Sequence, residues 1–275
     1  MMRKAKYAWV LLACMGQAVT AQDLKVAGLK TEHLECPMGV DTASPRLMWH
    51  MVSERKGARQ QSYRLVVGQD SAQVAAGEGD AWDTGVMASD CISARYDGKP
   101  LKPRTRYYWQ VAVTDETGRK ALSDVAYFET GKMGMDAWQG NWISDSRDCH
   151  HQPAPYFRRK FSVNKPVRSA RIYVAVAGLY QLHFNGKRLG DTMLDPVYTR
   201  FDRRNMYVTY DVTSAIKLQE NVVGIVLGNG WYNHQPLAVW NFETAPWRNR
   251  PAEVLSALGG NPDDIAALKA TTERW

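Results

Sequence analysis

Residues 107–113 read Tyr-Tyr-Trp-Gln-Val-Ala-Val, and this stretch decides the fold class. Every second residue from Tyr107 to Val113 is aromatic or aliphatic, which is the period of a β-strand with one buried face. Residues 115–118, Asp-Glu-Thr-Gly, then predict a turn, after which Tyr127 and Phe128 begin a returning strand. The stretch therefore predicts a pair of strands in a β-sandwich.

Shorter segments before this pair have the same character. Residues 46–49, 63–67 and 82–85 each have the length of one strand, and turn residues separate them. About seven short strands within about 110 residues are typical of an immunoglobulin or fibronectin III-like sandwich. We therefore predict that residues 22–131 form one such domain.

A second unit follows a linker at residues 131–136 and covers residues 138–251. Residues 170–177 are apolar except for Arg171, which predicts a strand buried on both faces. Asn185-Gly186 predicts a tight type I′ hairpin turn, and residues 207–212 and 221–227 predict two further strands. The chain is thus predicted to be all-β, with an immunoglobulin-like sandwich followed by a jelly-roll-like one.

The C-terminal segment departs from this pattern. Asn261-Pro262-Asp263-Asp264 is typical of a helix start, with a capping Asn, Pro at the first helical position and acidic residues in the first turn. We therefore treat residues 252–275 as an atypical, short helical tail. On this interpretation the second sandwich is incomplete.

The N-terminus has the layout of a secretory signal peptide over residues 1–21. Basic residues at positions 3, 4 and 6 precede a short apolar run, and small residues lead up to Ala21. This layout predicts a periplasmic or secreted protein, and a lipoprotein anchored at Cys14 is the alternative. No later stretch reaches the roughly 18 apolar residues of a transmembrane helix.

Charge and cysteine content argue against other classes of protein. The 35 Lys and Arg against 28 Asp and Glu give a net charge of +7 without long basic runs, so we predict no nucleic-acid partner. Cys36, Cys91 and Cys149 allow one disulfide but no disulfide framework. His150-His151 has no partner motif, so the sequence predicts no metal site.

Several motifs resemble the N-terminal region of bacterial α-L-rhamnosidases, which are inverting glycoside hydrolases. Each motif is weak by itself, and the order and spacing of the set carry the resemblance over residues 24–250. The motifs are WQGNWI (138–143), PYFRR (155–159), GLY (178–180), FNGKRLG (184–190), DPVYT (195–199), TYDVT (209–213) and LGNGWY (227–232). Past residue 251 we expect the resemblance to fail.

The resemblance implies an enzymatic activity for the parent family and a location for its catalytic residues. The family hydrolyses terminal α-L-rhamnosyl residues, with its two carboxylates in an α/α-barrel downstream. This chain lacks the Asp-rich barrel motif, so we identify no catalytic residue and predict no hydrolysis by the chain alone. Solvent-exposed or turn-capping roles are expected for Asp191, Asp195, Asp202 and Asp211.

Carbohydrate binding is the function that remains. The residues after the last predicted strand mix flat rings with amides, which suits a sugar ring. The candidate substrate-binding residues are Asn229, Trp231, Tyr232, Asn233, Trp240 and Asn241, with His234 and Trp247 nearby. The resemblance implies a rhamnose-containing glycan and a downstream catalytic domain as partners. We predict no cofactor, and calcium is the alternative by analogy with related sugar-binding modules. The alternatives are a structural collar for that domain and a cell-surface adhesion module.

Overall fold

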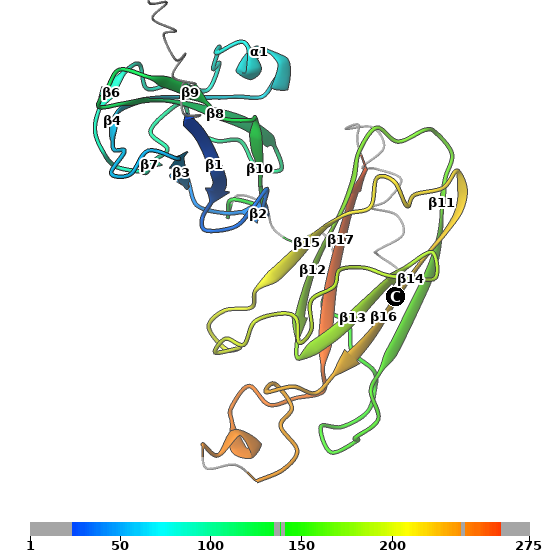
Figure 1. Cartoon of the computed structure of the whole chain (residues 1–275). Coiled ribbons are helices and arrows are strands. Elements are labelled where there is room, and N and C mark those ends of the chain that lie inside the picture. The colour runs from blue at the N-terminus through cyan, green and yellow to red at the C-terminus, as the bar shows by residue number, and fades with distance from the viewer. Residues whose placement is uncertain (1–23, 135–137, 139–140, 238–239, 260–275) are drawn as a thin grey trace, which may run out of the picture.

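The computed structural model describes residues 24–134, 138, 141–237 and 240–259, and the side chains of residues 253–259 are not described. It contains two consecutive β-sandwiches (Figure 1), so the predicted all-β fold class is confirmed. The predicted signal peptide with Cys14 and the predicted helix start at Asn261 lie outside the described residues.

The first sandwich packs a three-stranded sheet, β1-β3-β7, on a sheet ordered β2-β10-β8-β4-β5, with β6 paired to β4 and β9 to β8. Its elements are β1 (Leu24–Thr31), β2 (Met38–Val40), β3 (Arg46–Ser53), β4 (Gln60–Gly68), α1 (Ser71–Ala75), β5 (Trp82–Asp83), β6 (Met87–Ala88), β7 (Ser93–Arg95), β8 (Arg106–Asp115), β9 (Lys120–Leu122) and β10 (Ala126–Thr130). The predicted alternation in β8 is confirmed, because Tyr107, Trp109, Val111 and Val113 are all buried in the core between the sheets.

The second sandwich packs a four-stranded sheet, β11-β16-β13-β14, on a three-stranded sheet, β15-β12-β17. Its elements are β11 (Tyr156–Val163), β12 (Ala170–Ala177), β13 (Leu179–Phe184), β14 (Lys187–Arg188), β15 (Tyr207–Asp211), β16 (Gln219–Gly228), η1 (Phe242–Thr244) and β17 (Ala252–Gly259). Its core includes Ile172, Val174, Leu182, Phe184 and Ile225.

The strand β17 corrects the prediction for the C-terminal segment. Residues 252–259 do not leave the sandwich, because β17 pairs with β12 along its whole length, from Ala170↔Gly259 to Ala177↔Ala252. The prediction was wrong because Ala, Leu and Glu are common in this segment and favour helices. Pairing overrides that preference, since β17 satisfies the hydrogen-bonding groups on the second edge of the central strand β12.

The predicted Asn-Gly hairpin joins β13 to β14. Asn185 (φ 50°) and Gly186 (φ 82°) both have the left-handed backbone of a type I′ turn. The Asn185 side chain also accepts a hydrogen bond from Val222 N (2.8 Å) and donates one to the Asn221 side chain (2.9 Å). Asn185 is therefore a turn residue that ties the hairpin to β16, as its sequence context predicts.

A buried ion network joins the two sandwiches. The carboxylate of Glu129 on β10 is almost fully buried and receives two parallel hydrogen bonds from Arg171 on β12, at 2.7 and 2.8 Å. Arg106 on β8 lies 3.1 Å from the same carboxylate, and Asp211 on β15 lies 2.8 Å from Arg171. Each buried charge thus faces an opposite charge from the other sandwich or a neighbouring strand.

A second contact beside this network brings the backbones of the two sandwiches close together. The Tyr207 hydroxyl on β15 donates to the Asp41 carboxylate (2.7 Å) and accepts from the backbone N–H of Lys132 (2.9 Å). A Cβ atom at Gly131 would collide with this hydroxyl, so the position requires glycine. Trp138, the first described residue of the second unit, packs edge-on against Tyr207 at 5.8 Å between ring centroids.

Cys36, Cys91 and Cys149 are free thiols, so the disulfide that the sequence allows is absent among these described cysteines. Within the described ranges, the chain has no helix long and apolar enough to cross a membrane.

The ion network generates a test of the contact between sandwiches. Glu129→Gln keeps the side-chain shape but leaves Arg171 without its carboxylate, so we expect the free energy of unfolding to fall by about 2–4 kcal/mol. Urea denaturation, monitored by tryptophan fluorescence, measures the change in the free energy of unfolding. The control is Lys160→Gln, whose exposed pair with Glu220 is worth at most about 1 kcal/mol. An equal effect in both variants would contradict the assigned role of Glu129.

Asp115 provides a pH-dependent test in the turn after β8. Burial disfavours its charge, but hydrogen bonds from Thr117 and Arg119 outweigh this effect and hold the pKa of Asp115 well below its usual value. A depressed pKa stabilises the fold above the unfolded pKa of about 3.9, and that stability is lost as the pH falls toward the folded pKa. We expect Asp115→Asn to be less stable at pH 7 and its deficit to shrink below about pH 4.

Thermal melting of both proteins between pH 7 and pH 3 measures this deficit. Asp124→Asn, which changes an exposed carboxylate near the same turn, is the matched control and should change stability little at pH 7. A deficit for Asp115→Asn that stays constant down to pH 3 would refute the argument.

Candidate functional site

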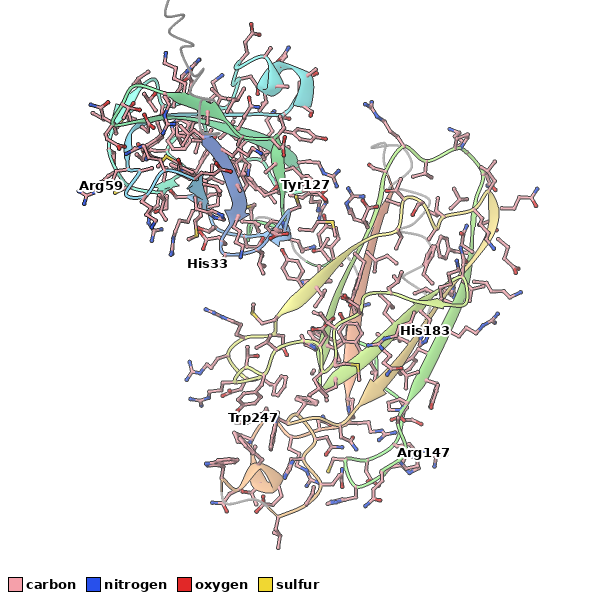
Figure 2. All side chains as sticks on the ribbon, viewed as in Figure 1. His33, Arg59, Tyr127, Arg147, His183 and Trp247 are labelled. Carbon is pink, nitrogen blue, oxygen red and sulfur yellow. The ribbon has the colours of Figure 1, made fainter. Side chains whose placement is uncertain are left out.

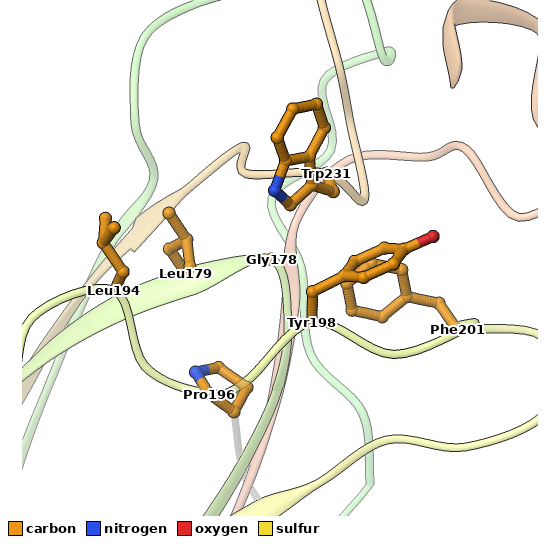
Figure 3. A pocket seen from close by; sticks show the side chains of 7 residues that line it. All are labelled: Gly178, Leu179, Leu194, Pro196, Tyr198, Phe201 and Trp231. Carbon is orange, nitrogen blue, oxygen red and sulfur yellow. The ribbon is translucent and has the colours of Figure 1, made fainter. Parts of the chain in front are cut away.

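A pocket of about 210 Å³ opens at one end of the second sandwich (Figure 3). Its walls come from the β12–β13 junction, the β14–β15 loop and the β16–β17 loop. The lining residues are Gly178, Leu179, Leu194, Pro196, Tyr198, Phe201 and Trp231. Pockets for drug-sized ligands have volumes of roughly 300–1,000 Å³. This pocket is smaller, and its size suits a single sugar ring.

Trp231 is the centre of an aromatic cluster around this pocket. Its indole stacks on His234 at 5.0 Å between ring centroids and packs against Phe242 at 5.3 Å. Tyr198 and Trp240 meet it edge-on, each at 6.4 Å. Trp231 remains 41% exposed, Tyr198 44% and Trp240 69%. The cluster fixes these rings and still leaves aromatic surface open for stacking on a ligand.

The pocket also offers unused hydrogen-bonding groups. Within the described part of the chain, neither the indole N–H of Trp231 nor the hydroxyl of Tyr198 has a hydrogen-bond partner. An indole N–H donates to a ligand oxygen, and a tyrosine hydroxyl both donates and accepts. The site therefore combines apolar rings with a few polar groups, which is the usual make-up of a carbohydrate or small-molecule site.

The predicted site residues divide into two groups. Trp231 lines the pocket, Trp240 stands exposed beside it, and the exposed Asn241 caps η1 through its backbone carbonyl, which accepts from Thr244. Tyr232 is half-buried and packs edge-on against Phe201 at 5.2 Å, and this burial raises the pKa of its hydroxyl.

Asn233 and Asn229 hold the β16–β17 loop in place through their side chains. The Asn233 side chain is fully buried and donates to Cys149 O (2.9 Å) and to the side-chain oxygen of Asn229 (3.1 Å). Asn229 in turn lies 3.5 Å from Gln152 O. The side-chain NH2 group of Asn233 therefore anchors the β16–β17 loop to the segment before β11, and the contact of Asn233 with a substrate stays a prediction.

Sequence reasoning missed the wall formed by the β14–β15 loop. Tyr198 and Phe201 face Trp231 and Tyr232, although about 30 residues separate the two loops in the sequence. The available signal was the DPVYT motif at residues 195–199, which is one of the motifs that carry the family resemblance and which contains Tyr198. Phe242, which joins most rings of the cluster, carried no signal of its own.

The pocket is lined by a glycine and by aliphatic and aromatic residues. No carboxylate or imidazole is among its lining residues, whereas inverting hydrolysis needs a pair of carboxylates. Asp195 bonds Thr192, and Asp202 pairs with Arg200, so these acids have local partners.

Calcium is the cofactor that the family resemblance raises. Calcium takes six to eight oxygen ligands, usually with several carboxylates among them. No group of three or more His, Cys, Asp or Glu side chains that could hold a metal comes together in the described ranges.

Comparisons with known proteins agree with this architecture. Residues 26–134 match the N-terminal immunoglobulin domain of Rha78A-like proteins, and residues 165–275 match the α-L-rhamnosidase N-terminal domain. The second match runs to residue 275, so the expectation that the resemblance fails past residue 251 is wrong.

Individual relatives are much longer than this chain. An α-L-rhamnosidase of Alteromonas sp. (strain LOR) is 31% identical over 96% of this chain and 30% of its own length. One of Formosa agariphila is 30% identical over 85% of this chain and 26% of its own length. The structure of the α-L-rhamnosidase from Dictyoglumus thermophilum is similar at a TM-score of 0.75 and 31% identity, over 87% of this chain and 28% of that one. The chain thus spans less than a third of these relatives.

The buried amide of Asn233 generates a prediction about the site loop. Asn233→Ala removes the hydrogen bonds to Cys149 and Asn229. We therefore expect the free energy of unfolding to fall by about 1–3 kcal/mol and proteolysis within the β16–β17 loop to be faster. Urea denaturation and limited trypsin digestion measure the two effects. Asn164→Ala, which truncates an exposed Asn in another loop, should change neither. A digestion pattern identical to that of the wild type would refute the anchoring role.

Proposed function

We propose that this chain, an N-terminal portion of an α-L-rhamnosidase-like protein, binds rhamnose-containing carbohydrate in the Trp231 pocket of its second sandwich. In this role it is non-catalytic and supports a downstream catalytic part, which in the parent family hydrolyses terminal α-L-rhamnosyl residues. The signal-peptide layout of residues 1–21 supports export to the periplasm or beyond.

The observation that carries the proposal is the chemistry of the pocket lining. Leu179, Leu194, Pro196 and Phe201 present apolar surface, and Tyr198 and Trp231 add unpartnered polar groups at the rim. Rhamnose is a 6-deoxy sugar, so it carries a methyl group where most hexoses carry a hydroxymethyl group. A methyl group gains from apolar burial, whereas a hydroxyl buried there without a partner loses free energy.

A structural collar is the second candidate function, and the exposed apolar residues favour it. Apolar side chains gather on the same two loops as the pocket and face solvent: Met193, Leu194, Val197, Leu237 and Trp240. Exposed apolar surface of this kind marks an interaction site. A downstream catalytic domain could cover these residues, and in that case the pocket would bind no free sugar.

The test compares two sugars that differ at one atom. L-mannose has the ring stereochemistry of L-rhamnose but carries a hydroxyl on C6, so we expect L-rhamnose to bind about tenfold more tightly. Trp231→Ala should weaken L-rhamnose binding by about tenfold or more because it removes the central ring. Titration calorimetry on the whole chain, with and without a calcium chelator, measures these affinities and any calcium dependence.

Trp142→Ala is the matched control, because Trp142 is 48% exposed but does not line the pocket. Equal binding of the two sugars would contradict the role of the apolar lining. No heat with either sugar would reject the binding function and leave the collar as the function that the surface supports.

A further inference from the structure

The outer face of the sheet β11-β16-β13-β14 carries a row of basic side chains. Strand register places Arg158 opposite Gly224, Gly224 opposite His183, and His183 opposite Arg188 (His183 is labelled in Figure 2). Directly opposed residues of neighbouring strands point to the same face of a sheet. The row therefore crosses all strands of this sheet. In order across the strands it consists of Arg158, Gly224, which has no side chain, the imidazole of His183, and Arg188.

This row faces away from the core. The alternate residues Phe157, Leu182 and Ile225 belong to the hydrophobic core between the sheets, so their neighbours Arg158, His183 and Gly224 lie on the opposite face. A Cβ atom at Gly224 would meet only Phe157 O, at 3.8 Å. The glycine leaves a shallow open position between the basic side chains.

The row has positive charge that nearby acids do not neutralise. Across the described residues, Arg158 and His183 have no ion pair or hydrogen bond. Arg188 is exposed and donates to Thr192 O at 2.6 Å, which is an uncharged acceptor. Glu220, which the register places on this face two rows away, is paired with Lys160 at 3.0 Å.

The charge of the whole chain is concentrated in this sandwich. Residues 138–259 contain 15 Lys and Arg against 9 Asp and Glu, whereas residues 24–134 contain 15 against 14. The long-range field of the second sandwich thus favours an anionic ligand.

The basic row is continuous with the Trp231 pocket. Leu179 lines the pocket and lies on β13 four residues before His183, so both side chains are on the same face. Four residues of a strand span about 13 Å. Between pocket and row, the same face presents the side chains of Gln181, Val226 and Tyr156, which are directly opposed across their strands. A ligand leaving the pocket along β13 therefore passes over polar and aromatic surface before reaching the cations.

We propose that this row is a second subsite, which binds the acidic group of an extended saccharide whose rhamnose ring occupies the Trp231 pocket. The inference rests on the proposed function and narrows its ligand class to acidic, rhamnose-containing oligosaccharides. Arg158 binds the carboxylate or sulfate through parallel N–H groups, and the sugar ring lies over Gly224. A nucleic acid needs many phosphate contacts for affinity, and this face has too few unpaired cations for that.

The experiment uses the whole chain and one oligosaccharide in two forms. The first form alternates rhamnose with galacturonic acid, and the second is the same oligosaccharide with its carboxyl groups reduced to neutral alcohols. We expect the acidic form to bind about fivefold more tightly at low ionic strength. This advantage should disappear in 0.5 M salt, because salt screens the attraction between exposed charges. Titration calorimetry measures both affinities.

Two variants test the row itself. Arg158→Gln removes the unpaired cation, and Gly224→Leu fills the open position, so each should bring the two forms to about equal affinity while the melting temperature stays unchanged. Arg168→Gln is the matched control, because Arg168 is an exposed arginine in the loop between β11 and β12. This control should retain the preference for the acidic form.

The outcomes separate this inference from the proposed function. If the wild type binds both forms equally, or if Arg158→Gln retains the preference, the basic subsite is rejected and rhamnose binding stands. If only the acidic form binds, the subsite is supported and the pocket is not. Absence of binding by either form rejects both proposals.

Discussion

The carboxylate of Glu129 is the group on which the arrangement of the two sandwiches depends. It is buried where the sandwiches meet, and a buried charge is tolerated only with close, well-oriented partners. Arg171 supplies these partners from the second sandwich, and Arg106 adds one from the first. Because the paired hydrogen bonds fix direction as well as distance, rotation of one sandwich against the other would leave a charge unpaired. The pocket is thereby presented in one orientation relative to the first domain.

Most of the fold could be predicted because it follows from local patterns. The alternation in residues 107–113 and the Asn185-Gly186 turn are each decided within a few residues, and the structure confirms both. The strand β17 could not be predicted in this way, since its composition favours a helix and the edge of β12 that it pairs with is about 80 residues away. The Glu129–Arg171 pair could not be predicted either, because strand patterns carry no information about contacts between domains.

The candidate site was predicted in part. The mixture of rings and amides after β16 pointed to a loop that lines the pocket with Trp231, and Trp231 and Trp240 are exposed there. Composition could not indicate which polar side chains the loop uses for itself, and Asn233 proved to be an anchor. The second wall, with Tyr198 and Phe201, became visible only once the β14–β15 loop was seen to fold against the first.

The placement of these walls has a consequence for how such a site can diversify. Both loops project from the end of a sandwich whose strands pair independently of them, so substitutions in one loop leave the pairing of the sheets in place and alter only the ring contacts between the two walls. New shapes of the pocket can therefore arise by mutation of one loop at a time, without an intermediate that fails to fold. A scaffold of this kind allows the shape of the pocket to change among descendants while their domain architecture stays constant.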